Sequence, residues 1–158
     1  MPGRPSSLCT EQMLMILPAP LDRARALGAD PALNVSGTDT LAPYQENKGY
    51  LDVVVEASGT QPALLSALSV VRPRGVVVQL GLGGDAMVPM NTVVTKEIDL
   101  VGSFRFHEEF SWAAQLIRDE RVNLVPVLSD VFPVVGALTA FEHANDRTRA
   151  MKVQIAFG

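Results

Sequence analysis

Two continuous apolar runs with a helical segment between them constrain the fold of this chain more than any other feature. Residues 51–56 and 76–80 carry valine on both faces, which is typical of interior strands in a parallel sheet. Thr60 and Pro62 predict the start of a helix between them. Its buried face is expected to consist of Leu64, Leu65, Leu68 and Val71. The three segments therefore predict one strand, helix, strand unit with a right-handed crossover.

The same alternation continues on both sides of this unit. Further strands are predicted over residues 12–17, 32–35, 98–104, 125–132 and 152–157. Further helices are predicted over residues 21–27, 107–121 and 137–145. The first of these helices is closed by Gly28, and the second carries one apolar stripe of Phe110, Ala113, Ala114 and Ile117. The chain is therefore predicted to be an α/β protein with a parallel sheet and crossover helices.

Three connecting segments have less regular patterns. Residues 72–75 are interpreted as a turn because they contain Pro73 and Gly75. Residues 85–90 are interpreted as extended chain. Residues 39–45 stay ambiguous, since Pro43 interrupts any helix there.

Composition limits the classes of partner and compartment. The chain has 158 residues, 47% of them hydrophobic, which is enough for one ordinary core. Its 13 Lys and Arg are scattered and the net charge is −4, so we expect no nucleic-acid partner. The single Cys9 can form no internal disulfide, and no apolar run is long enough to span a membrane. We therefore expect a cytoplasmic protein, with residues 1–11 as a disordered leader.

Small and polar residues follow three of the predicted strands, at residues 57–60, 80–84 and 104–106. In an open parallel sheet, ligands bind outside the carboxyl ends of the strands. The glycines would let a flat ligand approach the backbone, and exposed amides could bind a carboxamide or ribose; the alternative is that they only make turns. Arg105, between two phenylalanines, is interpreted as a donor for a hydroxyl or carboxylate, or else as a solvated side chain.

No complete catalytic or metal-binding motif is present. Residues 81–84 are glycine-rich, but extended chain rather than a helix follows them, so they are not a dinucleotide fingerprint. The pairs His107 with Glu109 and Glu142 with His143 have no third ligand at a usable spacing. We expect no catalytic residue and no metal ligand in this chain, and a self-contained hydrolase is improbable.

Several segments together carry a resemblance to a known family. They are residues 21–30 (LDRARALGAD), 52–59 (DVVVEASG), 75–81 (GVVVQLG), 96–106 (KEIDLVGSFRF) and 147–155 (RTRAMKVQI). Their order and spacing resemble the cofactor half of zinc-dependent medium-chain alcohol and polyol dehydrogenases, in the sorbitol and L-idonate 5-dehydrogenase branch. The resemblance covers residues 13–158.

The resemblance implies a division of the chain and a set of site residues. Residues 12–124 would be a partial dinucleotide-binding domain, and residues 125–158 a segment that returns to the catalytic domain. Ser58 and Gly59 would line the adenosine side of the cofactor. Leu80, Gly81 and Leu82 would approach the nicotinamide ribose or carboxamide, and Phe104 and Arg105 the nicotinamide and substrate. Residues 85–90 would pair with a second copy, making a homo-oligomer.

The activity implied is an oxidoreductase that transfers hydride between a polyol or sugar acid and NAD or NADP, with zinc as Lewis acid. The chain departs from that pattern. Met15 takes the position of the acidic residue that holds the adenosine ribose, and the zinc ligands, first strand and glycine-rich loop are missing. We expect an incomplete Rossmann-like sheet, and a chain that is truncated and inactive alone, whether by gene-model error, decay or splitting. Alternatives are a non-catalytic interaction module and a weak adenosine- or NAD-binding module.

Overall fold

The computed structural model describes residues 13–15, 18–36, 40–146 and 148–158. The chain divides into two compact units, one of residues 38–107 and one that joins residues 1–37 to residues 108–158. The predicted leader and Cys9 lie outside the described residues, as do three residues of the strand predicted over 12–17.

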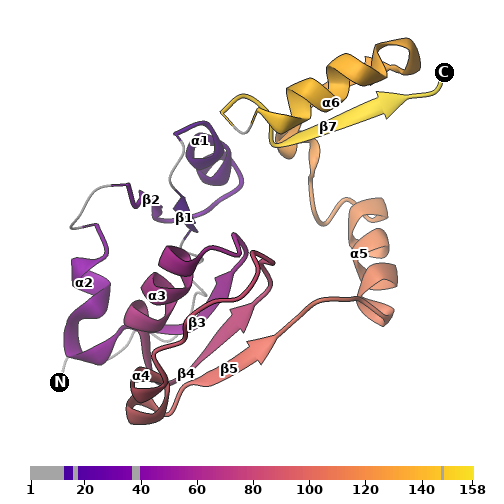
Figure 1. Ribbon diagram of the computed structural model, residues 1–158. Helices are drawn as coiled ribbons and strands as arrows, with labels where there is room; N and C mark the ends of the chain where they lie inside the picture. The colour runs from indigo at the N-terminus through magenta and orange to yellow at the C-terminus, as the bar shows by residue number, and fades with distance from the viewer. Residues whose placement is uncertain (1–12, 16–17, 37–39, 147) are drawn as a thin grey trace. The chain divides into compact units, whose positions relative to one another are not determined.

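A three-stranded parallel sheet forms the centre of the unit of residues 38–107 (Figure 1). Its strands, in spatial order, are β3 (Leu51–Glu56), β4 (Val71–Gln79) and β5 (Asp99–Gly102). Helix α3 (Gln61–Val70) connects β3 to β4, and α4 (Met90–Lys96) precedes β5. The short helices α2 (Ala42–Gln45) and η1 (Glu46–Lys48) come before the sheet. The predicted strand, helix, strand unit and the α/β class are confirmed.

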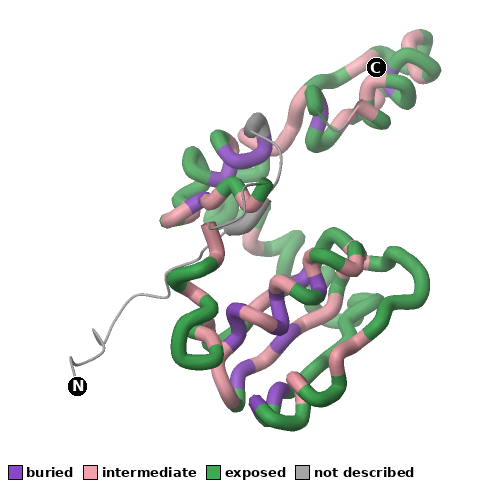
Figure 2. Tube along the Cα trace, turned by 60° about the vertical axis from the view of Figure 1, so that its left-hand side comes forward, coloured by how far each residue is buried: buried purple, intermediate pink, exposed green. Residues whose placement is uncertain are grey.

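Helices α3 and α4 contribute to one core on one face of the sheet. Leu64, Ala67 and Leu68 of α3 pack with Val71 and Val77 of β4 and with Ile98. Val54 of β3 and Val93 of α4 complete this cluster. The alternate residues Val53, Val55 and Val101, which point to the other face, are exposed. Figure 2 shows the buried positions gathered in the middle of this unit.

Strand β4 begins five residues before the predicted start, at Val71. In the β3–β4 ladder Leu51 pairs with Val71 and Val53 with Val76, so residues 72–75 loop out of the register. Arg74 has a φ of 58°, and Arg72 donates to the Asp52 carboxylate at 2.6 Å. The turn predicted at residues 72–75 is therefore a bulge inside a longer strand.

Three other features differ from the local sequence pattern. Among the described residues, β3 pairs with β4 alone, so a strand whose sequence is typical of an interior position lies at an edge, as expected for a sheet that lacks its first strand. Leu65 is 44% exposed because Leu64 and Leu68, four residues apart, take the face of α3 that meets the sheet. Helix α4 was not predicted, since its sequence, Met-Asn-Thr-Val-Val-Thr-Lys, is rich in β-branched residues that favour strands.

The other unit contains two small parallel pairs of strands. In the first, β1 (Met13–Met15) pairs with β2 (Ala32–Asn34), and α1 (Pro18–Ala26) lies between them in sequence. Gly28 has a φ of 98°, and the amides of Gly28 and Ala29 donate to the carbonyls of Arg25 and Ala24 at 3.0 Å. This pattern confirms the predicted glycine cap at the end of α1.

In the second pair, β6 (Leu128–Pro133) lies parallel to β7 (Lys152–Ala156), with α6 (Ala137–Asn145) between them in sequence. The 3₁₀ turns η2 (Val125–Val127) and η3 (Val134–Gly136) flank β6, which shortens the predicted strand. Helix α5 (Glu108–Arg118) buries none of its residues, so its predicted apolar stripe is exposed. Among the described residues, no helix is both long and apolar enough to cross a membrane.

Candidate functional site

The carboxyl ends of β3 and β4 bring two of the three predicted site segments into contact. The amides of Leu80 and Gly81 donate to the Glu56 carbonyl at 2.8 and 2.9 Å. The loop that carries Ser58 and Gly59 therefore lies against the loop that begins at Leu80. This contact places two of the predicted cofactor loops at one edge of the sheet.

Three glycines of these loops, Gly59, Gly81 and Gly83, are required by the contact between the loops. A Cβ atom on Gly81 would lie 2.0 Å from the Gly59 nitrogen, and one on Gly83 would lie 1.7 Å from the Gly59 oxygen. Gly59 has a φ of 72°, a conformation that favours glycine. The close approach that the sequence analysis expected for a ligand is thus made, at these three glycines, by the neighbouring loop.

The Glu56 side chain holds the two loops together through hydrogen bonds, and no motif in the sequence marked it as a site residue. Glu56 ends β3 and is 4% exposed. Its Oε1 accepts hydrogen bonds from the Ser58 amide (2.7 Å), the Ser58 hydroxyl (2.5 Å) and the Gly59 amide (3.0 Å). Its Oε2 accepts from the Gly59 amide (3.0 Å) and from Nε2 of Gln79 (2.5 Å).

Burial of Glu56 raises the pKa of its carboxyl, but the hydrogen bonds from Ser58, Gly59 and Gln79 together lower it further, so the net pKa lies below its usual value. The group is therefore an ionised acceptor whose two oxygens are both occupied. This occupancy makes Glu56 unsuited to act as a general base or to hold a ribose. The expectation of exposed amides is also wrong for Ser58, Gly59, Leu80 and Gly81, whose N–H groups are used internally.

Gln79, the last residue of β4, connects all three strand ends. Its Nε2 donates to Glu56 and to the Gly81 carbonyl (2.9 Å). Its backbone carbonyl accepts a hydrogen bond from the amide of Ser103, which follows β5 (3.0 Å). Since Nε2 faces two acceptors, the orientation of the amide is settled by its partners. Its Oε1 is buried and accepts no hydrogen bond from the described residues. A single amide in a run of valines was the signal in the sequence that could have identified it.

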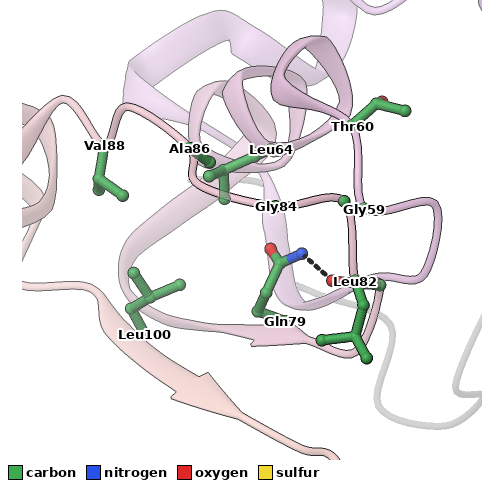
Figure 3. Close-up of a pocket in the computed structure, with 11 residues that line it drawn as sticks. Gly59, Thr60, Leu64, Gln79, Leu82, Gly84, Ala86, Val88 and Leu100 are labelled. Carbon is green, nitrogen blue, oxygen red and sulfur yellow. Dashed lines mark hydrogen bonds between the residues drawn. The ribbon is translucent and has the colours of Figure 1, made fainter.

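A pocket of about 340 Å³ lies beside Gln79, between the two loops, α3 and β5 (Figure 3). Its lining residues are all uncharged: Gly59, Thr60, Leu64, Gln79, Gly81, Leu82, Gly83, Gly84, Ala86, Val88 and Leu100. In Figure 3 the Gln79 amide group is directed toward the middle of this lining, with its nitrogen bonded to the Gly81 carbonyl. Such a pocket suits an uncharged, largely apolar group.

Phe104 and Arg105 are not among the residues that line this pocket. Both are exposed, and the Arg105 guanidinium carbon lies 4.5 Å from the centre of the Phe104 ring. This geometry is that of a cation–π contact, which holds the guanidinium at the end of β5 while leaving its donors accessible.

The described residues do not fit a zinc ion, because no group of three or more His, Cys, Asp or Glu side chains converges among them. His143 is hydrogen-bonded through Nε2 to Asp130 at 2.8 Å, which joins α6 to β6.

Comparisons with known proteins give one consistent result. The family model described as zinc-binding dehydrogenase matches residues 15–119. The chain is 39% identical over 143 residues to an L-idonate 5-dehydrogenase (NAD(P)(+)) of Escherichia coli, covering 90% of this chain and 41% of that protein. It is 28% identical to a sorbitol dehydrogenase of Bos taurus, covering 85% of this chain and 39% of that protein.

Solved structures agree with the sequence matches. The crystal structure of L-idonate 5-dehydrogenase from Escherichia coli superposes with a TM-score of 0.87 at 38% identity, covering 92% of this chain and 42% of that chain. That of 2R,3R-butanediol dehydrogenase from Bacillus subtilis, at 19% identity, has a TM-score of 0.83 and shows likeness of fold alone. The chain spans about two fifths of the length of the curated relatives it matches. These results confirm the predicted resemblance and fold.

Proposed function

The chain belongs to the zinc-binding dehydrogenase family, and from that premise we propose that it supplies the cofactor-binding edge of a cytoplasmic oxidoreductase. The reaction would be hydride transfer between a polyol or sugar acid, of the L-idonate or sorbitol type, and NAD or NADP. The observation that carries this proposal is the pair of loops after β3 and β4, held in contact around Glu56 beside an uncharged pocket.

The residues of this edge fit the uncharged parts of a dinucleotide better than its phosphates. The pocket is lined by glycine backbone and aliphatic side chains, with no cation among them. We propose that Ser58 and Gly59 face the adenosine side, and that Leu80, Gly81 and Leu82 contact the nicotinamide ribose or carboxamide through carbonyls and side chains. When bound, the nicotinamide ring supplies the hydride chemistry.

Arg105 is proposed as the substrate-binding residue. Its guanidinium is exposed at the end of β5 and is oriented by Phe104, so it can donate to a hydroxyl or carboxylate of the substrate. No step is assigned to zinc, because the described residues hold no ligand set for it. We also propose that residues 12–124 act as a partial dinucleotide-binding domain and that residues 125–158 are the segment that returns to the catalytic domain.

Calorimetric titration of the chain with NAD tests this proposal. The expected dissociation constant is in the millimolar range, because four loop amides are used internally and no cation lines the pocket. Each missing charge-assisted hydrogen bond weakens binding by about 1.5 to 3 kcal/mol. Absence of binding would contradict the proposal, and a micromolar constant would show that the amides are available after all.

A second proposal concerns self-association through residues 85–90, which would make the chain an interaction module even without catalysis. Residues 85–89 have no regular secondary structure, and Met87 is 82% exposed. Met90 begins α4, so it is not part of the extended chain predicted over residues 85–90. Val88 packs against the core and is only partly exposed. Two copies of this extended segment can pair at a two-fold contact, in which each copy covers the exposed Met87 of the other.

A further inference from the structure

The side chains of Glu56 and Gln79 form the only side-chain link that the described residues make between the loop after β3 and the loop after β4 at this edge. Glu56 binds the amides of Ser58 and Gly59 directly. Gln79 binds Glu56 with the same nitrogen that binds the Gly81 carbonyl. A continuous chain of hydrogen bonds thus runs from the Ser58 amide, through a carboxylate and an amide, to the carbonyl of Gly81.

This link is partly buried and leaves few alternative arrangements. Glu56 is 4% exposed, so its charge depends on these donors for stabilisation. Gln79 cannot rotate its amide without placing Oε1 against the carboxylate and a carbonyl. Because Oε1 accepts no hydrogen bond from the described residues, the contribution of the Gln79 side chain to this link comes from Nε2. A valine or leucine at position 79 would preserve the apolar strand pattern but not this connection.

We propose that Glu56 and Gln79 are positioning residues that couple the two candidate cofactor loops, so that a change in one loop is transmitted to the other. The consequence for binding rests on the proposed function: the adenosine and nicotinamide ends of a bound dinucleotide would contact two loops that are held in one arrangement. Neither residue is proposed to touch reacting atoms. The coupling itself is a property of the chain and can be measured with or without a ligand.

The test compares Glu56→Gln, Gln79→Met and the exchanged pair Glu56→Gln/Gln79→Glu with wild type, using amide nuclear magnetic resonance spectra. Gln79→Met leaves residue 56 unchanged and replaces the carboxamide with a thioether of similar length, so that the shared nitrogen is lost together with Oε1, which accepts no hydrogen bond from the described residues. We expect it to shift the Ser58 and Gly59 amides, through Glu56, and the Leu82 amide, which follows the Gly81 carbonyl. Asp52→Asn is the control, since Asp52 is an exposed carboxylate on the same strand, paired with Arg72.

The exchanged pair separates coupling from a general loss of packing. Its amide at position 56 can donate to the new carboxylate at position 79 and still accept from Ser58 and Gly59. The Gly81 carbonyl, however, would face an acceptor. We therefore expect the Ser58 and Gly59 signals to return toward wild type while the Leu82 signal stays displaced. NAD binding, followed by titration in the same spectra, should weaken by about tenfold in Gln79→Met, because the two loops are no longer held in one arrangement.

The coupling would be overturned if the shifts in Gln79→Met were confined to residue 79 and its sequence neighbours. Equal displacement of both loops in the exchanged pair would also overturn it, because that result reports disrupted packing. If Gln79→Met shows the coupled shifts but wild type binds no NAD, the proposed function fails and the coupling stands. If Glu56→Gln does not fold, Gln79→Met still decides the question.

Discussion

Lys96 shows how one side chain can complete a helix from a distant position. It is buried, and its Nζ donates to the carbonyls of Leu68 (2.7 Å), Ser69 (3.0 Å) and Val71 (3.0 Å) at the end of α3. Three donors meet three acceptors, and the positive charge lies at the negative end of the helix. Burial lowers the pKa of this lysine. Lys96 therefore joins α4 to the end of α3 without a carboxylate partner among these contacts.

Lys96→Met should lower the free energy of unfolding by about 2 kcal/mol, because three carbonyls at the end of α3 lose a charged donor. Urea denaturation measures this change. Lys152→Met, at an exposed position of β7, is the control and should have little effect. Equal stability of the two variants would show that water replaces the Lys96 donor.

Glu56 should make folding stability depend on pH in the acid range. Its folded-state pKa is lowered from the ordinary value of 4.5, so the unfolded chain binds more protons as the pH falls. Its contribution is fully present above pH 4.5 and is lost as the pH falls through the folded-state pKa.

The difference in unfolding free energy between wild type and Glu56→Gln, followed by urea denaturation between about pH 6 and 3, isolates this contribution. That difference should shrink as the pH falls. A difference that is constant with pH would mean that the carboxylate is not the form that binds Ser58 and Gly59.

At the scale of elements, the loop after β4 is attached to α3 by a side chain that imitates a strand. Nε2 of Gln61 donates to the Met87 carbonyl (2.7 Å), and the Met87 amide donates to Oε1 of Gln61 (2.6 Å). This pair of bonds is the one a neighbouring strand would make. It satisfies the backbone of Met87 on one side and leaves the Met87 side chain exposed.

Met87→Lys should abolish self-association through this segment, since a charge on each copy would face the other at a two-fold contact. Light scattering of wild type and variant measures the oligomeric state. Val135→Lys is the control, because Val135 is 93% exposed in the other unit. Position 88 is avoided because Val88 packs against the core. A monomeric wild type would refute this interface. Loss of association in both Met87→Lys and Val135→Lys would indicate non-specific association through exposed apolar side chains.

Contact between the two loops should not tolerate a side chain at Gly81. Gly81→Ala would place a Cβ atom 2.0 Å from the Gly59 nitrogen, so the loops must separate. We expect a loss of about 2 kcal/mol in unfolding free energy, within the usual range for overpacking. Gly102→Ala, where a Cβ atom meets nothing within 4 Å, is the matched control. Thermal denaturation of Gly81→Ala and Gly102→Ala measures this loss, and equal midpoints for the two variants would contradict this account.

At the scale of the whole molecule, the described residues form the proposed cofactor-binding edge, and no group of three or more His, Cys, Asp or Glu side chains converges among them. We predict that the purified chain alone neither binds zinc stoichiometrically nor oxidises sorbitol, xylitol or L-idonate. Metal analysis and an assay of NADH absorbance measure these properties. One tightly bound zinc per chain, or turnover that survives repurification, would refute the prediction.

Much of the architecture followed from local sequence pattern. The strand at Leu51–Glu56, the helix at Ala137–Asn145 and the glycine cap at Gly28 were predicted at the positions where the structure has them. Each depends on neighbouring residues, through β-branching, helical period or the freedom of glycine. Helix α4 was missed because its β-branched sequence favours a strand, while contacts of Val93 and Lys96 with distant residues support a helix.

Some features of the candidate site could also be predicted from local sequence, and others depend on the tertiary structure. The sequence by itself determined that loops follow three parallel strands and that small residues occupy them, because strand ends and glycines can be identified locally. Only the tertiary structure decided that Glu56 and Gln79 organise these loops, that Gly59 and Gly81 serve loop contact, and that Phe104 lies outside the pocket lining. The physical reason is that a buried hydrogen bond joins residues far apart in sequence, and no local pattern records which acceptor a donor will meet.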